Sequence, residues 1–281
     1  MRTLTATRVL SGALRGSSRP VVAETAAGPR LVKLRGAAQG TGSLVAEIIV
    51  AALAEALDLR VPPRDLVLLP AGTPTDDRDQ ELGDLLRDSV GVNLGFALLP
   101  RARDVSAQDL AAVAPATAAA VLWLDRLVLN PDRTPSNPNL LLSDGELFLI
   151  DQGAALRFQY DWSAVTEQSP GQSGHGGQAH VFEAATASAD WPLWDELFAR
   201  RLARDVLEAA VAAVPDDFLE PLLRERRAAA FIPAPDGAPA LAEQLRRRRA
   251  AYVAFLWKRL QPPRLFARAN RGSGSPGLTI D

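Results

Sequence analysis

The clearest element that the sequence predicts is a helix over residues 43–59, SLVAEIIVAALAEALDL. The run is rich in Ala and Leu, contains no Gly or Pro, and repeats its apolar residues at helical spacing. Ser43 stands where a capping residue would begin such a helix. On both sides the pattern changes to short runs of Val, Leu and Thr separated by Gly and Pro, which is typical of β-strands. The first hundred residues are therefore expected to be a strand-rich unit with one helix.

The strand patterns fall into definite segments. Residues 3–35 contain three runs that fit a meander, and the segments 65–70 and 90–100 predict two more strands. A polar surface loop is expected between them at residues 73–81. These segments leave the helix at 43–59 as the one helix expected before residue 100.

The second half of the chain has a different pattern. Residues 106–129 and 190–262 are mainly helical, and two short apolar runs around Asp144-Gly145 predict a hairpin between them. This order favours an α+β protein with two lobes. We expect a strand-rich N-terminal lobe over residues 1–100, a helical C-terminal lobe over residues 101–265, and a disordered tail over residues 266–281.

Composition excludes several classes of protein. Hydrophobic residues make up 47% of the 281, enough for a substantial core, and a formal net charge of −2 gives no general attraction to nucleic acid or anionic membrane. The absence of Cys excludes disulfides, thiolate metal sites and a cysteine nucleophile. No stretch has the length or apolarity of a signal peptide or membrane span, so a cytoplasmic protein is expected.

Lysine and asparagine are rare in this chain, so their positions are informative. Of the 31 basic residues only Lys33 and Lys258 are lysine, and three of the five asparagines, Asn130, Asn137 and Asn139, fall within ten residues. Where arginine serves nearly everywhere, a retained lysine is a candidate for a role that needs a compact ammonium group. The retained lysines and the asparagine cluster are therefore candidate functional positions.

Three polar residues have the types and order that phosphoryl transfer needs. Asp132 and Asn137 are five apart in a loop after a helix, and Asp151 ends an apolar strand after the predicted hairpin. One carboxylate receives the proton of the attacking hydroxyl, while a second carboxylate and an amide oxygen hold Mg²⁺. Asn, Asp and Pro are also ordinary turn residues, and turn chemistry alone accounts for the isolated loop. The combination with the hairpin and Asp151 favours phosphoryl transfer.

The N-terminal half contains a matching pair of charges. Lys33 lies on a predicted strand, and Glu47 lies on the predicted helix 43–59. Kinases need a strand lysine on the nucleotide phosphates and a helix glutamate that holds this lysine. A solvated helix residue is the alternative interpretation of Glu47.

Two glycine clusters are candidates for contact with phosphate. The first, between the first two strands, offers Gly12 and Gly16 for close backbone approach and the hydroxyls of Ser17 and Ser18. A plain hairpin loop explains this cluster equally well. The second cluster, RGAAQGTG at residues 35–42, follows Lys33 and is the alternative phosphate site. The sequence does not decide between the two.

The stretch 123–156, WLDRLVLNPDRTPSNPNLLLSDGELFLIDQGAAL, resembles the core of HipA-like kinases. It is also similar, more distantly, to the D-R-x-x-x-N loop of phosphatidylinositol-kinase-like enzymes. The segment 32–49, VKLRGAAQGTGSLVAEII, fits the same family. The family often has His where this chain has Gln152, which keeps hydrogen-bonding capacity but cannot titrate.

The resemblance implies a protein-kinase-like two-lobe fold and roles for particular residues. It implies Asp132 as catalytic base, Asn137 and Asp151 as Mg²⁺ ligands, and Lys33 held by Glu47 on the phosphates of ATP. It also implies Asn130 and Asn139 as supporting residues of the ATP site. The implied site residues are therefore Lys33, Glu47, Asn130, Asp132, Asn137, Asn139 and Asp151.

The resulting expectation is an ATP- and Mg²⁺-dependent phosphotransferase that acts on a hydroxyl, first of all Ser or Thr of a partner protein. The alternatives are a nucleotide-binding pseudokinase that serves as an interaction module, a kinase of small molecules or lipids, and an unrelated α+β structural protein. No zinc site is expected at His175 and His180, because no Cys or dense acidic cluster accompanies them. The Gly-, Ser- and Gln-rich segment 165–180 is expected to be a mobile loop, and the run Arg246–Arg249 a solvated helix face.

Overall fold

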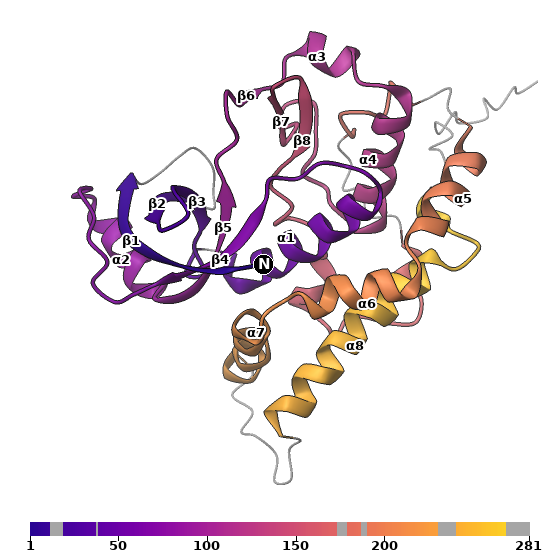
Figure 1. Cartoon of the computed structure of the whole chain (residues 1–281). Helices are drawn as coiled ribbons and strands as arrows, with labels where there is room; N and C mark the ends of the chain where they lie inside the picture. The colour runs from indigo at the N-terminus through magenta and orange to yellow at the C-terminus, as the bar shows by residue number, and fades with distance from the viewer. Residues whose placement is uncertain (12–18, 38, 173–178, 187–189, 230–239, 268–281) are drawn as a thin grey trace, which may run out of the picture.

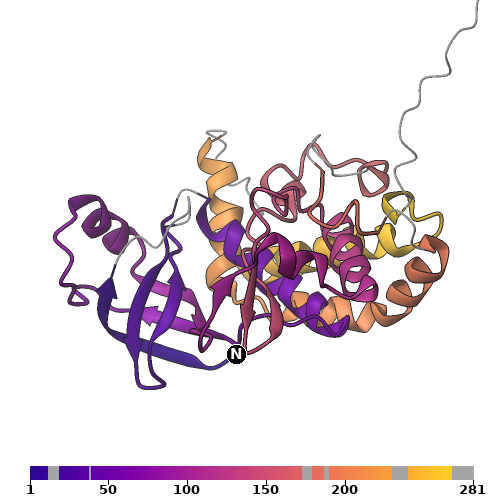
Figure 2. The ribbon, with the colours of Figure 1, turned by 90° about the horizontal axis from the view of Figure 1, so that it is seen from above.

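The structure is a computed structural model of the chain, and it describes residues 1–11, 19–37, 39–172, 179–186, 190–229 and 240–267. Helices and strands are both present, as the sequence predicts. The strands of the first hundred residues lie at one end of the molecule and most helices at the other (Figures 1 and 2). Helix α1 (Gly40–Ala56) lies between them.

Five strands close into a barrel in the order β1-β2-β3-β5-β4. Neighbouring strands run antiparallel, except that β1 and β4 run parallel and close the barrel. Closure pairs every strand on both sides and removes exposed sheet edges. The sequence predicts all five strands but not this closure, and their bounds are β1 (Thr3–Ser11), β2 (Val21–Thr25), β3 (Arg30–Lys33), β4 (Arg64–Leu69) and β5 (Gly91–Ala97).

Helix α2 (Gln80–Asp88) is a second helix before residue 100, so the expectation of one helix is wrong. The segment is short and polar and contains Gly83, which makes its helical pattern weak. It is a helix because Leu82 and Leu86 are buried in the small apolar cluster of the barrel strands. The Asp79 carboxylate caps it by accepting the N–H of Glu81.

Helix α1 confirms the strongest helix prediction but begins and ends earlier, at Gly40 and Ala56. Ser43 is not its cap, because this residue lies inside the first turn and its hydroxyl donates to the Gly40 carbonyl. The residue before the helix is Gln39, whose side chain makes no capping hydrogen bond. The first N–H groups of α1 therefore have no side-chain cap.

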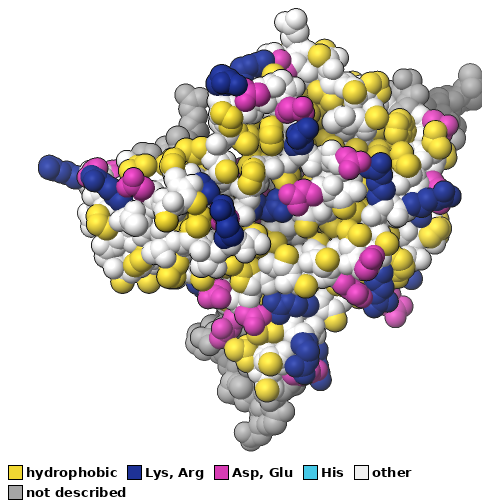
Figure 3. All heavy atoms as spheres, in the orientation of Figure 1, with side chains coloured by type: hydrophobic (Ala, Val, Ile, Leu, Met, Phe, Trp, Pro, Cys, Tyr) yellow, Lys and Arg dark blue, Asp and Glu magenta, His cyan; other side chains and the backbone are white. Residues whose placement is uncertain are grey.

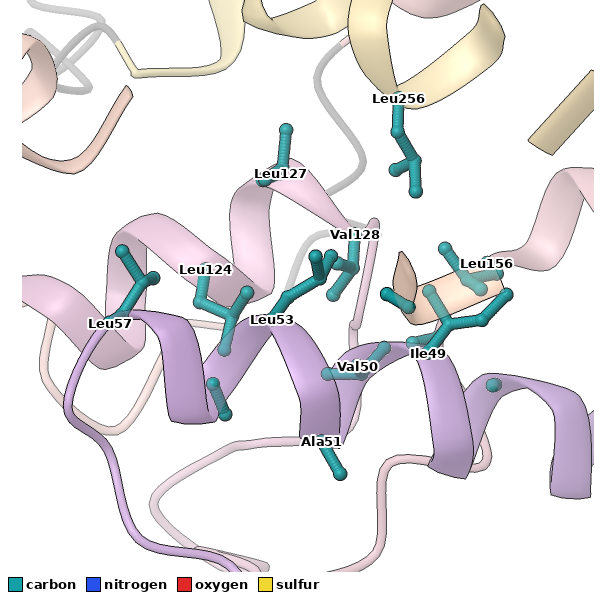
Figure 4. Close-up of a cluster of buried hydrophobic side chains, with 14 of the residues drawn as sticks. Ile49, Val50, Ala51, Leu53, Leu57, Leu124, Leu127, Val128, Leu156 and Leu256 are labelled. Carbon is teal, nitrogen blue, oxygen red and sulfur yellow. The ribbon is translucent and has the colours of Figure 1, made fainter. Parts of the chain in front are cut away.

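The main hydrophobic core surrounds α1. Figure 4 shows Ile49, Val50 and Leu53 of this helix beside Leu124 and Leu256, which come from two helices of the second half. Buried residues occupy nearly every position from Thr41 to Ala54, as expected for a helix that is apolar on all sides. The core of α1 is thus shared with the helices that follow residue 100.

The segment after residue 100 begins with short elements around a hairpin. The helices α3 (Ala107–Ala111) and α4 (Pro115–Leu127) come between β6 (Arg103–Asp104) and the hairpin of β7 (Leu140–Ser143) and β8 (Glu146–Leu149). Asp144 and Gly145 form its turn and have φ values of 52° and 82°. Positive φ at both positions is what the type I′ hairpin turn requires, and β7 pairs antiparallel with β8, so the hairpin prediction is confirmed.

The remaining chain is mainly helical, as predicted. Helix α1 packs against α6 and α7, and α8 packs against the same two helices. The bounds are α5 (Trp191–Arg201), α6 (Arg204–Ala212), α7 (Asp216–Ala229) and α8 (Leu241–Leu260), with 3₁₀ turns η1 (Arg157–Tyr160), η2 (Ser169–Gly171) and η3 (Leu265–Ala267). Phe266 and Ala267, assigned to the tail from sequence, are buried, and residues 268–281 lie outside the described residues.

Arginines of α8 tie surrounding segments together. Arg259 donates to the carbonyls of Pro170 (2.6 Å) and Gln172 (2.8 Å), which anchors part of the segment predicted as a mobile loop. The rest of that segment, residues 173–178 with His175, lies outside the described residues. In the predicted solvated face Arg249 donates to the carbonyl of Val214, and the Arg248 guanidinium lies 5.0 Å from the centre of the Trp162 ring. These arginines are therefore packing groups as well as surface charges.

Basic and acidic side chains are interspersed on the face shown in Figure 3. Such a mixture does not form the one-sided basic area that nucleic-acid binding uses. In the described part of the chain, none of the helices combines the length and apolarity that crossing a bilayer would take.

Candidate active site

Lys33, at the end of β3, forms ion pairs with two carboxylates from distant parts of the chain. Its Nζ donates to Oε1 of Glu47 on α1 and to Oδ1 of Asp151, which lies 2.6 Å away. Lys33 lies opposite Leu94 in the ladder of β3 and β5, so the barrel fixes its backbone. The core around α1 fixes Glu47 in the same way. The structure thus brings together three of the residues that the sequence predicts for the site.

The three charged groups differ in their exposure. The side chains of Lys33 and Glu47 are 10% and 2% exposed, whereas that of Asp151 is 43% exposed. Burial alone would lower the pKa of Lys33, but the charges and hydrogen bonds of Glu47 and Asp151 outweigh it and raise this pKa to about 12. The cluster therefore holds one ammonium group between two carboxylates, with Asp151 on its open side.

A cavity of about 270 Å³, here called the first cavity, opens beside this cluster. It lies just below the range of about 300–1,000 Å³ that is usual for small-molecule pockets. Its polar lining residues are Lys33, Glu47, Asp151 and Gln152. The other walls are apolar and are formed by Pro20, Leu31, Ala51, Val61, Pro62, Phe96, Ala97, Leu98, Leu99, Ala102, Leu141, Leu149 and Ile150.

The turn that carries Asp151 is fixed against α1. Asp151 follows β8 and has φ = 57°, a left-handed conformation that costs a non-glycine residue energy. The N–H of Gly153 donates to Oε1 of Glu47 at 3.1 Å. A Cβ at Gly153 would lie 3.2 Å from Cβ of Ser43, so a larger residue would press on the helix. These contacts hold the Asp151 carboxylate toward Lys33.

The loop after α4 holds Asp132 by hydrogen bonds with three asparagines. The N–H of Asp132 donates to Oδ1 of Asn130 (3.1 Å), and Nδ2 of Asn139 donates to Oδ2 of Asp132 (3.0 Å). Nδ2 of the exposed Asn137 donates to the Asp132 carbonyl at 3.3 Å. Asn137 and Thr134 also exchange backbone hydrogen bonds, which closes a tight turn. The loop thus presents Asp132 and Asn137 from one small framework.

A buried network, here called the Asp125 network, supports this loop from below. The Asp125 carboxylate accepts hydrogen bonds from Nδ2 of Asn130 (2.9 Å) and Nε of Arg133 (2.6 Å), and it lies 2.9 Å from Nε2 of His180. Arg133 also donates to Oε1 of Gln152 at 2.8 Å. Burial would raise the pKa of Asp125, but Arg133 and His180 lower it to about 2. The network joins the Asp132 loop to the residue that follows Asp151.

Sequence reasoning did not find the supporting roles of Asp125, Arg133 and His180. One signal was present, because Asp125 is an acidic residue inside the apolar run of α4 and is fully buried there. No spacing rule pointed to His180, which lies 55 residues away in the chain. Asn130 is also buried, and its side-chain amide donates to Asp125 of α4 and accepts from the N–H of Asp132. Its contact with ATP stays a prediction.

The predicted residues do not all line one cavity. Lys33, Glu47 and Asp151 line the first cavity and Asp132 lines a second one, whereas Asn130, Asn137 and Asn139 line neither. Asp151 and Gln152 line the first cavity, whereas the next residue, Gly153, lines a second cavity together with Asp132. Part of the second glycine cluster, including Gly36 and Gly40, lines this second cavity as well. The other candidate phosphate loop, with Gly12, Gly16, Ser17 and Ser18, lies outside the described residues.

Comparison with known proteins identifies a family. The sequence matches the family described as HipA-like kinase over residues 7–228. Among solved structures, this chain is similar to the proinflammatory kinase CtkA of Helicobacter pylori, with a TM-score of 0.45 and 14% identity over 74% of this chain and 90% of that chain. No curated protein matches the sequence. Because the family match extends over well more than half of the chain, the protein belongs to the HipA-like kinase family.

Proposed function

We propose that this protein is an ATP- and Mg²⁺-dependent phosphotransferase that transfers the γ-phosphoryl group to a Ser or Thr hydroxyl of another protein. The observation that carries the proposal is the buried Lys33, which pairs with Glu47 and Asp151 at the polar end of an apolar cavity. Phosphoryl transfer depends on such a lysine–glutamate pair and on a carboxylate beside it. In this proposal residues 1–100 and 101–265 are two lobes that meet at the first cavity.

The first cavity suits an adenine nucleotide. Its apolar walls match the faces of a purine ring, and its polar end offers the Lys33 ammonium to the phosphates. The pKa of about 12 means that this lysine is charged at every physiological pH. We assign Lys33 to the phosphates, with Glu47 as the residue that positions it.

The oxygen atoms of Asp151 and Asn137 suit Mg²⁺, which prefers oxygen ligands and is held by few protein groups plus phosphate and water. The described residues contain no group of three or more His, Cys, Asp or Glu that forms a protein-only metal site. We assign Asp151 and the amide oxygen of Asn137 as its protein ligands. The ion would supply positive charge against the phosphate oxygens. Lys33 and Glu47 would keep Asp151 turned toward it.

Asp132 is the proposed catalytic base. In this reaction the acceptor hydroxyl gives its proton to Asp132, its oxygen forms a bond to the γ-phosphorus, and the bond from that phosphorus to the bridging oxygen breaks to release ADP. The hydrogen bond from Asn139 orients the carboxylate, and the backbone bond to Asn130 fixes its position. Both contacts leave Oδ1 of Asp132 for the acceptor.

A pseudokinase and a kinase of small molecules or lipids remain the alternatives. A pseudokinase needs none of the catalytic side chains, whereas this chain retains Lys33, Glu47, Asp132, Asn137 and Asp151 together. This retention favours an active enzyme. The identity of the acceptor decides between a protein kinase and a small-molecule or lipid kinase.

The test is a labelling experiment with matched variants. Wild type, Asp132→Ala and Lys33→Ala are each incubated with γ-labelled ATP, Mg²⁺ and a lysate of the source cells. Asp132→Ala should lose about 10²–10⁴-fold in transfer rate, because a base acts mainly in the transition state. Its nucleotide binding should remain. Lys33→Ala should lose both.

Thermal unfolding separates binding from chemistry. A ligand at a hundredfold excess over its Kd adds about 2.7 kcal/mol of stability to the native state. ATP with Mg²⁺ should raise the melting temperature of wild type, and Asp151→Asn should remove the Mg²⁺-dependent part of this increase. Equal labelling by wild type and Asp132→Ala would contradict the base assignment. Binding without any labelling would establish the pseudokinase.

A further inference from the structure

The second cavity opens next to the proposed base and has a volume of about 850 Å³. Asp132 and Tyr160 line it, together with Arg35 and Arg157. The Tyr160 ring packs on the start of α1, since a Cβ at Gly42 would lie 2.8 Å from it. The cavity thus combines a carboxylate, which is that of the proposed base, with an aromatic wall and two cations.

The two arginines of this cavity have no acidic partner among the described residues. Most arginines in the described ranges form ion pairs with Asp or Glu, but within those ranges no carboxylate pairs with Arg35 or Arg157. One Nη of Arg35 donates to the backbone carbonyl of Asp217 at 3.2 Å, which holds the side chain without neutralising its charge. Arg157 is exposed at the start of η1. Both guanidinium groups therefore keep their charge for a ligand.

The rest of the lining adds no negative charge to balance them. Asp132 is the one acidic residue among the described residues that line this cavity. Gly40, the first residue of α1, also lines it, and the first turn of that helix carries neither a side-chain cap nor an acidic residue. Helix N-termini carry partial positive charge. The lining is thus positive apart from the carboxylate that is proposed to receive the proton.

We propose that the second cavity binds an acidic segment of the acceptor protein, so that carboxylates beside the reactive hydroxyl lie against Arg35 and Arg157. This inference rests on the proposed function, because it assigns Asp132 to the acceptor hydroxyl. The nucleotide phosphates have their own cation in Lys33, which lines the first cavity and not the second. Arginine suits carboxylates because its planar group donates two parallel hydrogen bonds.

The test measures binding directly. Three fluorescent peptides differ only in whether their Ser is flanked by Glu, Gln or Lys, and their binding to the full chain with ATP and Mg²⁺ is followed by anisotropy at low salt. The Glu peptide should bind about tenfold more tightly than the Gln peptide, as charge-assisted hydrogen bonds allow, and the Lys peptide most weakly. The preference should fall as salt screens the exposed charges.

Variants of the two arginines test whether the preference for the Glu peptide arises in the second cavity. Arg35→Ala and Arg157→Ala should each reduce the Glu preference, and Arg157→Lys should restore part of it. The matched control is Arg200→Ala, which removes an exposed arginine that pairs with Glu196 on α5 and lies outside both cavities. The stabilisation of each variant by ATP should equal that of wild type.

Two results would overturn the inference. One is equal binding of the three peptides by wild type. The other is a loss of ATP stabilisation in the arginine variants with an unchanged Glu preference, which would assign the arginines to the nucleotide.

The labelling test keeps this inference separate from the proposed function. Transfer to a lysate protein without a Glu preference would refute the acidic segment alone. A Glu preference that Arg35→Ala and Arg157→Ala abolish, without any transfer, would support the acidic site and refute the kinase.

Discussion

The Lys33 cluster and the Asp125 network are both built around charges that are taken out of water, and they differ in what is left open. In the Asp125 network the carboxylate and the Arg133 side chain are 0% exposed, and their polar atoms are satisfied by Asn130, His180, Gln152 and backbone carbonyls. In the Lys33 cluster Asp151 is 43% exposed and lines a cavity. The Asp125 network leaves no polar group open to a ligand, whereas the Lys33 cluster leaves the Asp151 carboxylate open to one.

This difference separates support from function. The Asp125 network connects α4, the Asp132 loop and the Asp151–Gly153 turn, so its removal should mainly lower the free energy of unfolding. The Lys33 cluster is positioned by the barrel and by α1. Substitutions at Asp151, on its open side, should therefore reduce ligand affinity more than stability. Each of the following predictions tests this division.

The largest effect is expected from Asp125→Ala. Removal of one partner from a buried charge pair leaves the other charge unpaired, so the free energy of unfolding should fall by about 3–5 kcal/mol, measured by urea denaturation. Asp125→Asn, which keeps the size and some hydrogen bonds, should lose less and provides a folded variant if the Ala variant fails to fold.

The matched change on the open side is Asp151→Ala. Lys33 keeps Glu47 as a partner, and the removed carboxylate is partly exposed, so this variant should lose less than about 1 kcal/mol of stability without ligand. Equal losses in the two Ala variants would mean that the division between support and function is wrong.

The acid response of stability should also identify the Asp125 network. Arg133 and His180 hold the pKa of Asp125 at about 2, against about 3.9 for an unfolded Asp. A folded-state pKa below the unfolded value gives stability that is complete above about pH 4 and is lost as the pH falls toward 2. The contribution is roughly 2–3 kcal/mol. The stability difference between wild type and Asp125→Asn should therefore shrink over this range, and a constant difference would contradict the assignment.

Local pattern and chemistry predicted much of the fold. The strands β1 to β5, the hairpin at Asp144-Gly145 and the helix around Glu47 follow from spacing and turn residues. The closed barrel could not be predicted in this way, because it depends on pairing between segments far apart in the chain. Helix α2 did leave a local signal, with Asp79 as its cap and Leu82 and Leu86 four residues apart, which the expectation of a polar loop over residues 73–81 missed. Ser43 failed as a cap because α1 continues through the glycines before it, where helix propensity is low.

In the candidate site, too, some residues could be predicted from the sequence and others could not. The ion pairs of Lys33 with Glu47 and Asp151 agree with the residues that sequence reasoning had selected by type and order. The supporting contacts of His180 and Arg133 could not be selected, because a buried hydrogen bond between distant residues leaves no periodic signal. The roles of Lys33, Glu47, Asp132, Asn137 and Asp151 in catalysis remain predictions.

The smallest effect is expected from Gln152→His, which installs the residue that similar kinases often carry. Gln152 is buried, accepts a hydrogen bond from Arg133 at 2.8 Å and donates to the Ile150 carbonyl at 3.3 Å. A neutral imidazole has one acceptor and one donor, so it can serve both partners. At pH 8 the free energy of unfolding should change by less than about 1 kcal/mol, and phosphoryl transfer should persist.

The pH dependence of this variant and a matched control show whether hydrogen bonding is what the position requires. A protonated imidazole would face the Arg133 guanidinium, so Gln152→His should lose stability relative to wild type as the pH falls through about 6.5. Gln152→Leu has similar bulk but accepts no hydrogen bond, which leaves an Arg133 N–H unsatisfied and should cost about 1–3 kcal/mol at every pH. If the Leu variant is as stable as the His variant at pH 8, the link between Arg133 and residue 152 does not support the site. The Asp125 network would then end at Arg133, without reaching the turn that carries Asp151.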